Sequence, residues 1–348
     1  MNLNLPSIPP FDESSAESAR QRQNRLTKPT GALGWLETLS IQLAGITARP
    51  RPRFHRKAVI LMAADHGVAS EGVSAYPPEV TAQMVLNFQR GGAAINVLAR
   101  QAGAQVSVVD IGVNYDFDNL PGIVNRKIAR GTANLRRQPA MTRAQAEQAV
   151  QTGLEVAEEH IREGVDLIAT GEMGIGNTTP AAAITAVMTG KPVEAVTGRG
   201  TGLDEVGLAR KIEVISAAIA LHRPDPTDAL DVLAKIGGFE IGGLAGVMIG
   251  TAARRVPVVV DGFISGAAAL IAAGLKPEIK PYLIASHLSQ EIGHRAVWEA
   301  LGLQPLLDLD LRLGEGTGAV LAFHLIEAAV RILDEMATFD EAGVSDRA

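Results

Sequence analysis

The sequence of 348 residues predicts an α/β fold in which a parallel sheet carries helices on both faces. Five short runs are predominantly apolar, as expected for strands that are buried on both faces. Amphipathic helical patterns separate these runs. The two ends of the chain lack this alternation and look helical. We expect them to form a small helical subdomain, because chain termini often lie close together.

Each predicted strand ends in a polar or glycine-rich cluster. The strands cover residues 58–63, 106–111, 166–170, 256–261 and 282–286. The helical patterns cover residues 78–88, 93–102, 142–163, 180–188, 204–222, 264–273 and 319–336. We therefore expect one α/β domain over residues 50–305. The helical subdomain should combine residues 1–49 with residues 306–348, which also carry a C-terminal loop and helix.

Composition excludes several classes of protein. Hydrophobic residues make up 47% and charged residues 20%, which is sufficient for a large core. A net charge of −6 argues against nucleic-acid binding. The absence of cysteine excludes disulfides and thiolate metal sites, and it leaves the redox compartment open. The chain does not begin like a signal peptide and has no apolar run of membrane-spanning length, so we expect a cytoplasmic protein.

A carboxylate in a glycine loop near the C-terminus is the first candidate for chemistry. The loop 314–318 reads Gly-Glu-Gly-Thr-Gly and precedes the helical pattern 319–336. Flanking glycines let other groups approach Glu315, which makes it a candidate general base. The alternative is that Glu315 only favours the helix N-terminus electrostatically, and the loop alone leaves both interpretations open.

The residues that follow the strands are further candidates, because ligands of parallel sheets bind beyond the carboxyl ends of the strands. These clusters are residues 65–67, 110–112, 171–174, 261–263 and 286–287. The loop 171–180 has three glycines, Glu172, Asn177 and two threonines before a helix, which favours an anion site over a simple capped turn. It matches neither the Walker loop nor the dinucleotide fingerprint, so ATP and NAD are not supported.

A second glycine loop, residues 198–204, precedes the helix that bears Lys211. Thr201 and Gly202 could donate N–H groups to a phosphate, and Lys211 could add a positive charge. A capped turn at Asp204 with a solvated Lys211 explains the same pattern equally well.

The stretch 71–88 supplies flat and soft apolar side chains. Tyr76, Met84 and Phe88 suit an aromatic ligand, although ordinary core packing is an equal alternative for Met84 and Phe88. The sequence near His66 offers too few additional ligands for a metal site, so we favour a structural hydrogen bond for this residue.

Together these loops resemble the nicotinate-nucleotide–dimethylbenzimidazole phosphoribosyltransferase family. The matching segments are residues 25–34, 64–68, 71–88, 91–96, 171–179, 198–204, 261–265 and 313–318. The resemblance covers nearly the whole chain. It implies a pentosyltransferase that moves phosphoribose from nicotinate mononucleotide to 5,6-dimethylbenzimidazole. The products would be α-ribazole 5'-phosphate, used in cobalamin nucleotide-loop assembly, and nicotinate.

The resemblance also implies a Rossmann-like sheet, a homodimer, and no metal or other cofactor. It makes Glu315 the catalytic base and places Glu172 in the active site near the ribose. The implied phosphate and ribose contacts are Gly174, Gly176, Asn177, Thr178, Gly200, Thr201, Gly202, Lys211 and Asp261. The implied benzimidazole pocket consists of Tyr76, Gln83, Met84, Phe88 and Leu313.

Two other functions compete with this one. An NAD-dependent oxidoreductase would need a G-x-G-x-x-G loop after the first strand, where this chain has Ala64-Asp65-His66-Gly67. A non-catalytic protein that binds a nucleotide or benzimidazole would not need the intact Glu172 and Glu315. The residues do not indicate which base is preferred as acceptor.

Overall fold

A computed structural model describes residues 3–118 and 120–345. Its centre is a six-stranded sheet in the order β3-β2-β1-β4-β5-β6, and every neighbouring pair is parallel. The strands are β1 (Lys57–Ala64), β2 (Ala104–Gly112), β3 (Ile123–Asn125), β4 (Leu167–Met173), β5 (Val258–Val260) and β6 (Leu283–Ala285). The predicted parallel sheet is confirmed, and the short edge strand β3 is an addition to the prediction.

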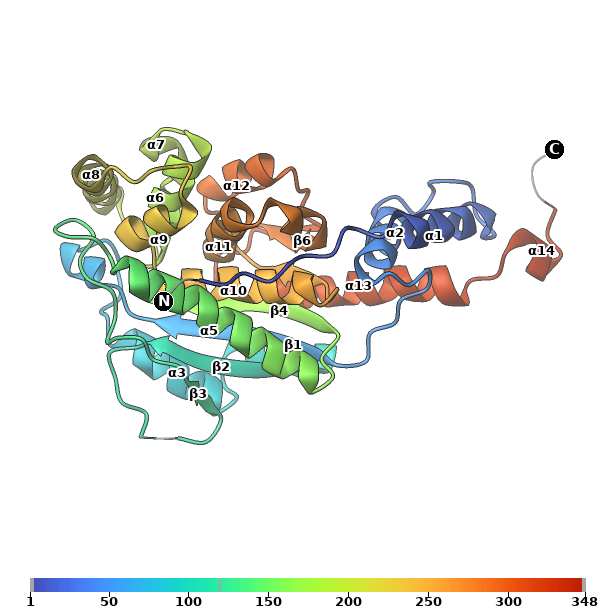
Figure 1. The fold of residues 1–348 in the computed structure, drawn as a ribbon, viewed down its shortest axis with the longest axis horizontal. Helices are drawn as coiled ribbons and strands as arrows, with labels where there is room; N and C mark the ends of the chain where they lie inside the picture. Colours follow the sequence, from blue (N-terminus) through green and yellow to red (C-terminus); the bar gives the residue numbers. More distant parts are fainter. Residues whose placement is uncertain (1–2, 119, 346–348) are drawn as a thin grey trace.

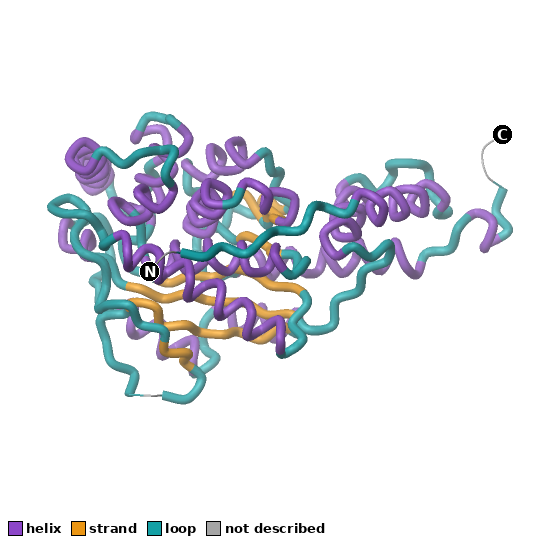
Figure 2. The backbone as a smooth tube through the Cα atoms, in the orientation of Figure 1, coloured by secondary structure: helices purple, strands orange, loops and turns teal. Residues whose placement is uncertain are grey.

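Helices cover both faces of the sheet, as predicted (Figure 2). Alternate side chains of β1 enter two separate cores, because successive residues of a strand point to opposite faces. Ile60 and Met62 pack with α5 (Arg143–Arg162) and α10 (Phe239–Ala253). Val59 and Leu61 pack on the opposite face, with a second set of helices. That set comprises α3 (Val80–Gln89), α4 (Ala94–Ala102) and α13 (Thr317–Glu335).

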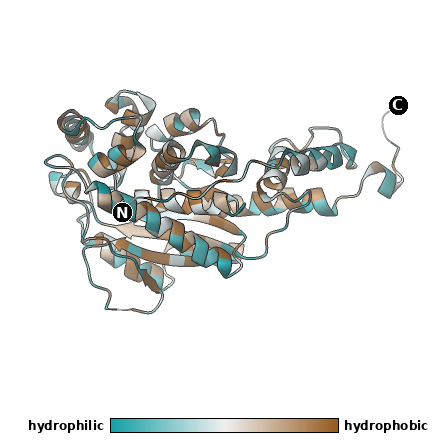
Figure 3. Ribbon diagram, in the orientation of Figure 1, coloured by the Kyte–Doolittle hydropathy of each residue, from teal (hydrophilic) through white to brown (hydrophobic). Residues whose placement is uncertain are grey.

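Small residues let α5 and α10 pack closely. A Cβ atom at Gly153 of α5 would lie only 1.8 Å from the carbonyl oxygen of Gly243 in α10, so only glycine fits there. All of α10 except its last residue is buried. Figure 3 shows the strands mostly brown to white, whereas α5 carries hydrophilic colour as well as hydrophobic.

The remaining helices of the α/β region lie on one side of the sheet in Figure 1. They are α6 (Thr178–Thr189), α7 (Val193–Val196), α8 (Glu205–His222), α9 (Ala229–Ile236), α11 (Phe263–Leu275) and α12 (Gly293–Leu301). Two 3-10 helices cover Gly67–Glu71 and Pro277–Tyr282. A two-stranded parallel ladder of β7 (His287–Leu288) and β8 (Leu307–Asp308) joins the segment after β6 to the chain before the 314–318 loop.

The helices near the two ends of the chain pack together, as predicted, whereas residues 3–11 extend along the α/β region, where Leu3, Leu5 and Ile8 pack against its core. Helices α1 (Glu13–Arg25) and α2 (Trp35–Thr47) lie beside the C-terminal part of α13, and α14 (Phe339–Ala342) follows (Figure 1). Leu26 forms a β-bridge with Thr338, and Arg22 donates to the Leu333 carbonyl at 2.6 Å. The proposed division at residues 49/50 and 305/306 stays a prediction, and residues 1–2 and 346–348 of those ranges lie outside the described residues.

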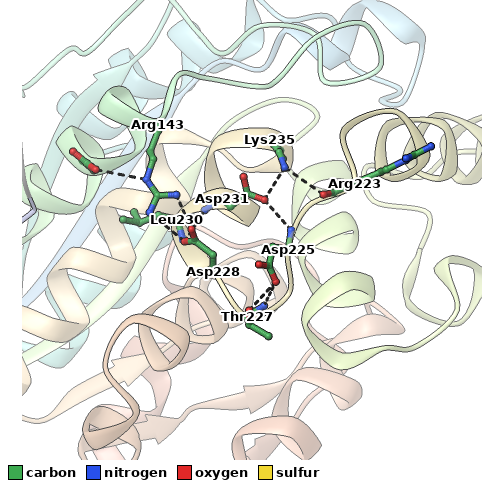
Figure 4. A network of polar contacts seen from close by, with 9 residues as sticks. Arg143, Arg223, Asp225, Thr227, Asp228, Leu230, Asp231 and Lys235 are labelled. Atoms are coloured by element: carbon green, nitrogen blue, oxygen red, sulfur yellow. Dashed lines mark hydrogen bonds and ion pairs between the residues drawn. The ribbon is translucent and has the colours of Figure 1, made fainter.

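A polar network closes the turn between α8 and α9 (Figure 4). Asp228 caps α9 by accepting from the Leu230 and Asp231 N–H groups at 3.1 Å each. Arg143, at the start of α5, donates to the Asp228 carboxylate at 2.7 Å. Lys235 bonds Asp231 at 2.8 Å, one helical turn away. The network therefore ties the α9 N-terminus to the start of α5.

Within the described residues, no helix combines the length and the apolar character that crossing a membrane requires.

Candidate active site

A cavity of about 470 Å³ lies at the carboxyl edge of the sheet. Segments from distant parts of the chain line it, including the loops that follow β4 and β5 and the 312–315 segment. The predicted site residues among its lining are Tyr76, Met84, Glu172, Gly174, Asn177, Thr178, Gly200, Thr201, Leu313 and Glu315. The fold thus brings the two glycine loops and the candidate base to one hollow, where parallel α/β sheets usually bind ligands.

Glu315 is 5% exposed and lines this cavity. Its Oε2 accepts the Ile95 N–H at 3.1 Å, in the first turn of α4. Burial raises the pKa of the Glu315 carboxyl, and the nearby Asp261 also raises it, against the lowering effect of the Ile95 hydrogen bond. Such a carboxylate takes a proton more readily than a solvated one.

Glu172, near the end of β4, is also 5% exposed and accepts a hydrogen bond from the Asn177 side-chain amide. Burial, aided by the charges of Asp261, Glu240 and Glu315, raises the pKa of Glu172 to about 8. At neutral pH this side chain is therefore mostly protonated. It can donate a hydrogen bond, whereas Glu315 can accept a proton.

Lys211 of α8 is fully buried and does not line the cavity. Its Nζ donates to Thr178 Oγ1 at 2.7 Å and to the Gly198 carbonyl at 3.2 Å. Burial lowers the pKa of Lys211 to about 8, while Glu291 raises it. Lys211 thus joins the two glycine loops and places positive charge behind Thr178.

The 71–88 stretch is tied to the second glycine loop. Thr201 Oγ1 accepts the Ala75 N–H at 2.8 Å and lies 3.0 Å from Ser74 Oγ. Tyr76 and Leu313 are 56% and 58% exposed, so the cavity opens to solvent beside them. The structure does not bring Phe88 to the cavity, because this side chain is buried in the core against the sheet.

Four other predicted residues also lie off the cavity lining. Gln83 is exposed on α3, and Gly202 is exposed in its loop. Gly176 is a buried residue of the first glycine loop, and Asp261 is buried against the backbone of Gly316.

The structure adds cavity residues that the sequence did not single out. Ser289, Glu291 and Arg312 line the cavity with the predicted residues. Among the described lining residues, Arg312 is the one arginine or lysine, and its guanidinium donates to the Gly200 carbonyl at 3.4 Å. Glu291 is 7% exposed, and its Oε2 has no hydrogen-bond partner among the described residues.

Two of the clusters that follow strands, residues 65–67 and 110–112, do not line the cavity and instead make polar contacts that stabilise the fold. His66 Nε2 lies 2.9 Å from Glu240 Oε1, and both side chains are fully buried. Burial lowers the pKa of His66, but the Glu240 carboxylate outweighs this and the pKa rises. Asp110 pairs with Lys127 at 2.7 Å. Within residues 3–118 and 120–345, no cluster of three or more His, Asp or Glu is arranged to hold a metal ion.

Comparison with known proteins identifies the family. The family model described as Phosphoribosyltransferase matches residues 8–344. The nicotinate-nucleotide–dimethylbenzimidazole phosphoribosyltransferase of Chloroflexus aggregans is 65% identical over 98% of this chain and 96% of that protein. The protein of the same name from Geobacter sulfurreducens is 56% identical, over 98% of this chain and 97% of its own.

Solved structures agree. The crystal structure of CobT from Thermus thermophilus superposes with a TM-score of 0.93 and 52% sequence identity. The match covers 96% of this chain and 99% of that chain. The resemblance inferred from the loops is confirmed. The chain belongs to the nicotinate-nucleotide–dimethylbenzimidazole phosphoribosyltransferase family.

Proposed function

We propose that this protein transfers phosphoribose from nicotinate mononucleotide to 5,6-dimethylbenzimidazole, with Glu315 as the general base. The products are α-ribazole 5'-phosphate, used in cobalamin nucleotide-loop assembly, and nicotinate. The observation that carries the proposal is the buried Glu315 carboxylate, which the Ile95 N–H holds at the cavity surface.

The reaction needs a base and no acid. Nicotinate leaves from an N-linked pyridinium, whose nitrogen already carries positive charge. One benzimidazole nitrogen attacks the anomeric carbon from the opposite face and inverts its configuration, while the other nitrogen still carries a proton. Positive charge builds on the new ring, and that N–H proton becomes acidic. Glu315 accepts this proton and stabilises the developing cation electrostatically.

Burial suits Glu315 to this role. A base works best when its pKa approaches the working pH, because it is then both ionised and basic enough. Burial moves the pKa of Glu315 in that direction. The hydrogen bond from Ile95 keeps the pKa from rising further and fixes the orientation of the carboxylate.

The two glycine loops hold the nucleotide in this account. The N-terminus of α6 and the Thr178 and Thr201 side chains bind the phosphate, with Lys211 behind Thr178. Arg312 adds a second cation at the cavity surface. Fixing the phosphate fixes the anomeric carbon, so the attack becomes effectively intramolecular.

Glu172 has a different role from Glu315. Its pKa of about 8 keeps it protonated at neutral pH, so it donates a hydrogen bond to a ribose oxygen. A second full negative charge beside Glu315 would raise the pKa of Glu315 too far for an efficient base.

Apolar side chains orient the benzimidazole. Tyr76, Met84 and Leu313 line the cavity and offer contact to a flat ring. Gln83 and Phe88 belong to this pocket only indirectly, through the α3 helix that carries Met84.

A homodimer fits the exposure of Tyr76 and Leu313, which a second subunit would cover. Light scattering after size-exclusion chromatography tests this, and a monomer at micromolar concentration would refute it. The cytoplasmic location stays a prediction that cell fractionation tests.

Mass spectrometry of the products tests the function itself. The protein is incubated with nicotinate mononucleotide and 5,6-dimethylbenzimidazole, and α-ribazole phosphate and nicotinate are measured. We expect equal amounts of both products, which appear only when both substrates are present. Binding of both substrates without product would indicate the non-catalytic alternative.

A further inference from the structure

Asp261 follows β5 and is fully buried. Its Oδ2 accepts the Gly316 N–H at 3.2 Å, and its Oδ1 accepts the Ala319 N–H at 2.9 Å. Both N–H groups belong to the start of α13, where backbone donors have no partner inside the helix. Asp261 does not reach the cavity surface. Its carboxylate thus bonds the backbone around the base.

The backbone that Asp261 holds has an unusual conformation. Gly314, Glu315 and Gly316 have φ angles of +83°, +64° and +99°. A non-glycine residue in this left-handed region is strained and persists only where its surroundings impose the conformation. The Glu315 carbonyl also presses on β4, because a Cβ at Gly171 would lie 2.4 Å from that oxygen. The base therefore sits on a strained, closely packed loop.

Asp261 is itself held in place. Its N–H donates to Thr170 Oγ1 at 3.1 Å, and Ser286 Oγ donates to its carbonyl at 3.3 Å. His287 Nδ1 lies 4.0 Å from its Oδ1. Thr170 of β4 and Ser286 after β6 thus fix the backbone of Asp261, and His287 lies beside its carboxylate.

We infer that Asp261 is a positioning residue, whose carboxylate holds the Gly316 and Ala319 N–H groups so that the adjoining Glu315 is directed into the cavity. It does not contact the substrate, in contrast to the ribose or phosphate role that the family resemblance implied. The inference rests on the proposed function, because it requires Glu315 to be the base. Glu315 then has two anchors, Asp261 for its backbone and the Ile95 N–H for its side chain.

The test is the Asp261→Asn variant, which keeps the size of the side chain but removes the charge and one acceptor. We expect kcat to fall about 100-fold, as for a misplaced catalytic group. The KM values for both substrates and the Kd for nicotinate mononucleotide should stay within about threefold of the wild type, because no substrate contact is lost. A large rise in the nucleotide KM or Kd would identify a substrate contact and overturn the inference.

The pH dependence of kcat distinguishes the loss of the Asp261 charge from a mere loosening of the packing, because loosened packing alone would not shift it. The charged and titratable groups around this carboxylate are Glu172, Glu315 and His287. Asp261 raises the pKa of Glu315, so removing its charge should shift the acid limb of kcat to lower pH. An unshifted limb would contradict the inference.

Two further variants test the inference if Asp261→Asn does not fold and separate it from the proposed role of Glu315. If Asp261→Asn does not fold, Thr170→Val removes the acceptor of the Asp261 N–H, together with a long 3.4 Å hydrogen bond to the Val259 carbonyl. We expect a roughly tenfold loss of kcat with unchanged KM, and wild-type kcat would overturn the inference. Glu315→Gln separates this inference from the function. An inactive Glu315→Gln beside a fully active Asp261→Asn rejects only the positioning role, whereas an active Glu315→Gln rejects the base.

Discussion

The carboxylates around the cavity and those of the α8–α9 turn lie in opposite settings. Glu172, Asp261 and Glu315 are buried, and burial raises the pKa of each. In the turn, the hydrogen bond from Arg143 is the main cause that lowers the pKa of Asp228, and hydrogen bonds from Thr227 lower that of Asp225 (Figure 4). In the turn, hydrogen bonds favour the charged carboxylates and stabilise the fold, whereas burial around the cavity favours the protonated form of each carboxyl group.

This difference in setting distinguishes carboxyl groups that can take part in a reaction from those that only stabilise the fold. A group whose charge is disfavoured by its surroundings persists at a site where its reactivity is needed. A capped and paired carboxylate has little capacity to accept a proton. Substitutions in the two regions should therefore affect different measurements.

The largest expected effect is that of Glu315→Gln on turnover. Glutamine keeps the shape and can still accept the Ile95 N–H, but it cannot accept a proton, so kcat should fall about 10²–10⁴-fold. The free energy of unfolding should stay equal or rise, because a buried charge is removed. Steady-state kinetics and urea unfolding measure both. Glu335→Gln, at the exposed end of the α13 helix that follows the 314–318 loop, is the matched control, and near-normal activity of Glu315→Gln would refute the assignment.

Lys211→Met comes next, because it removes the buried cation of the site while nearly keeping its volume. We expect the KM for nicotinate mononucleotide to rise about tenfold or more, with little change for the benzimidazole. In the wild type, burial lowers the pKa of Lys211 to about 8, so nucleotide affinity should weaken above that pH. Equal effects on both substrates would argue against a phosphate role. Kinetics with each substrate varied in turn decide this.

Glu172→Gln tests how the buried carboxyl group affects the free energy of unfolding at different pH values. The folded-state pKa of about 8 lies above the ordinary 4.5, so the folded protein binds this proton more tightly between those values. The resulting stabilisation is complete below pH 4.5 and is lost as pH rises through 8. Gln should remove this dependence and make the protein more stable than the wild type at pH 8 and above, by a few kcal/mol at most. Urea unfolding at pH 5 and pH 8.5 measures it, and a less stable variant at pH 8.5 would contradict the account.

The smallest effect is expected for Asp228→Ala in the turn. Loss of the α9 cap should lower the free energy of unfolding by about 1 kcal/mol and leave kcat unchanged. The pKa of Asp228 is lowered from 3.8, so its contribution is present above that pH and is lost as pH falls below it. Thermal unfolding at pH 7 and pH 3 shows whether the difference disappears in acid. Asp228→Asn, a good cap without charge, should lose less at pH 7.

The sheet could be predicted because its signals are local. The run 58–63 is apolar without interruption, is short and contains β-branched residues, as expected for a strand buried on both faces. Helix α10 could not be assigned, because Gly242, Gly243, Gly246 and Gly250 weaken the helix propensity of its sequence. Its glycines make sense only beside α5, which is a tertiary contact.

The candidate site was partly predictable for the same reason. Glycine-rich loops can be recognised in the sequence alone, and Glu172 and Glu315 lie within such loops. Arg312 and Glu291 lie in segments with no such local pattern, and only the β7–β8 ladder and the loop packing bring them to the cavity. Phe88 shows the converse, because helical spacing alone does not tell which face of α3 meets the core.

The most direct test of the central claim uses an acceptor that has no proton to give. In 1,5,6-trimethylbenzimidazole a methyl group replaces the N–H hydrogen, so attack on nicotinate mononucleotide leaves nothing for Glu315 to accept. The measurement is the ratio of wild-type to Glu315→Gln turnover with this acceptor, by mass detection of the ribosylated product. With 5,6-dimethylbenzimidazole we expect this ratio to be about 10²–10⁴. With the methylated acceptor we expect it to be no larger than about tenfold. A ratio that stays as large with the methylated acceptor would contradict proton transfer to Glu315.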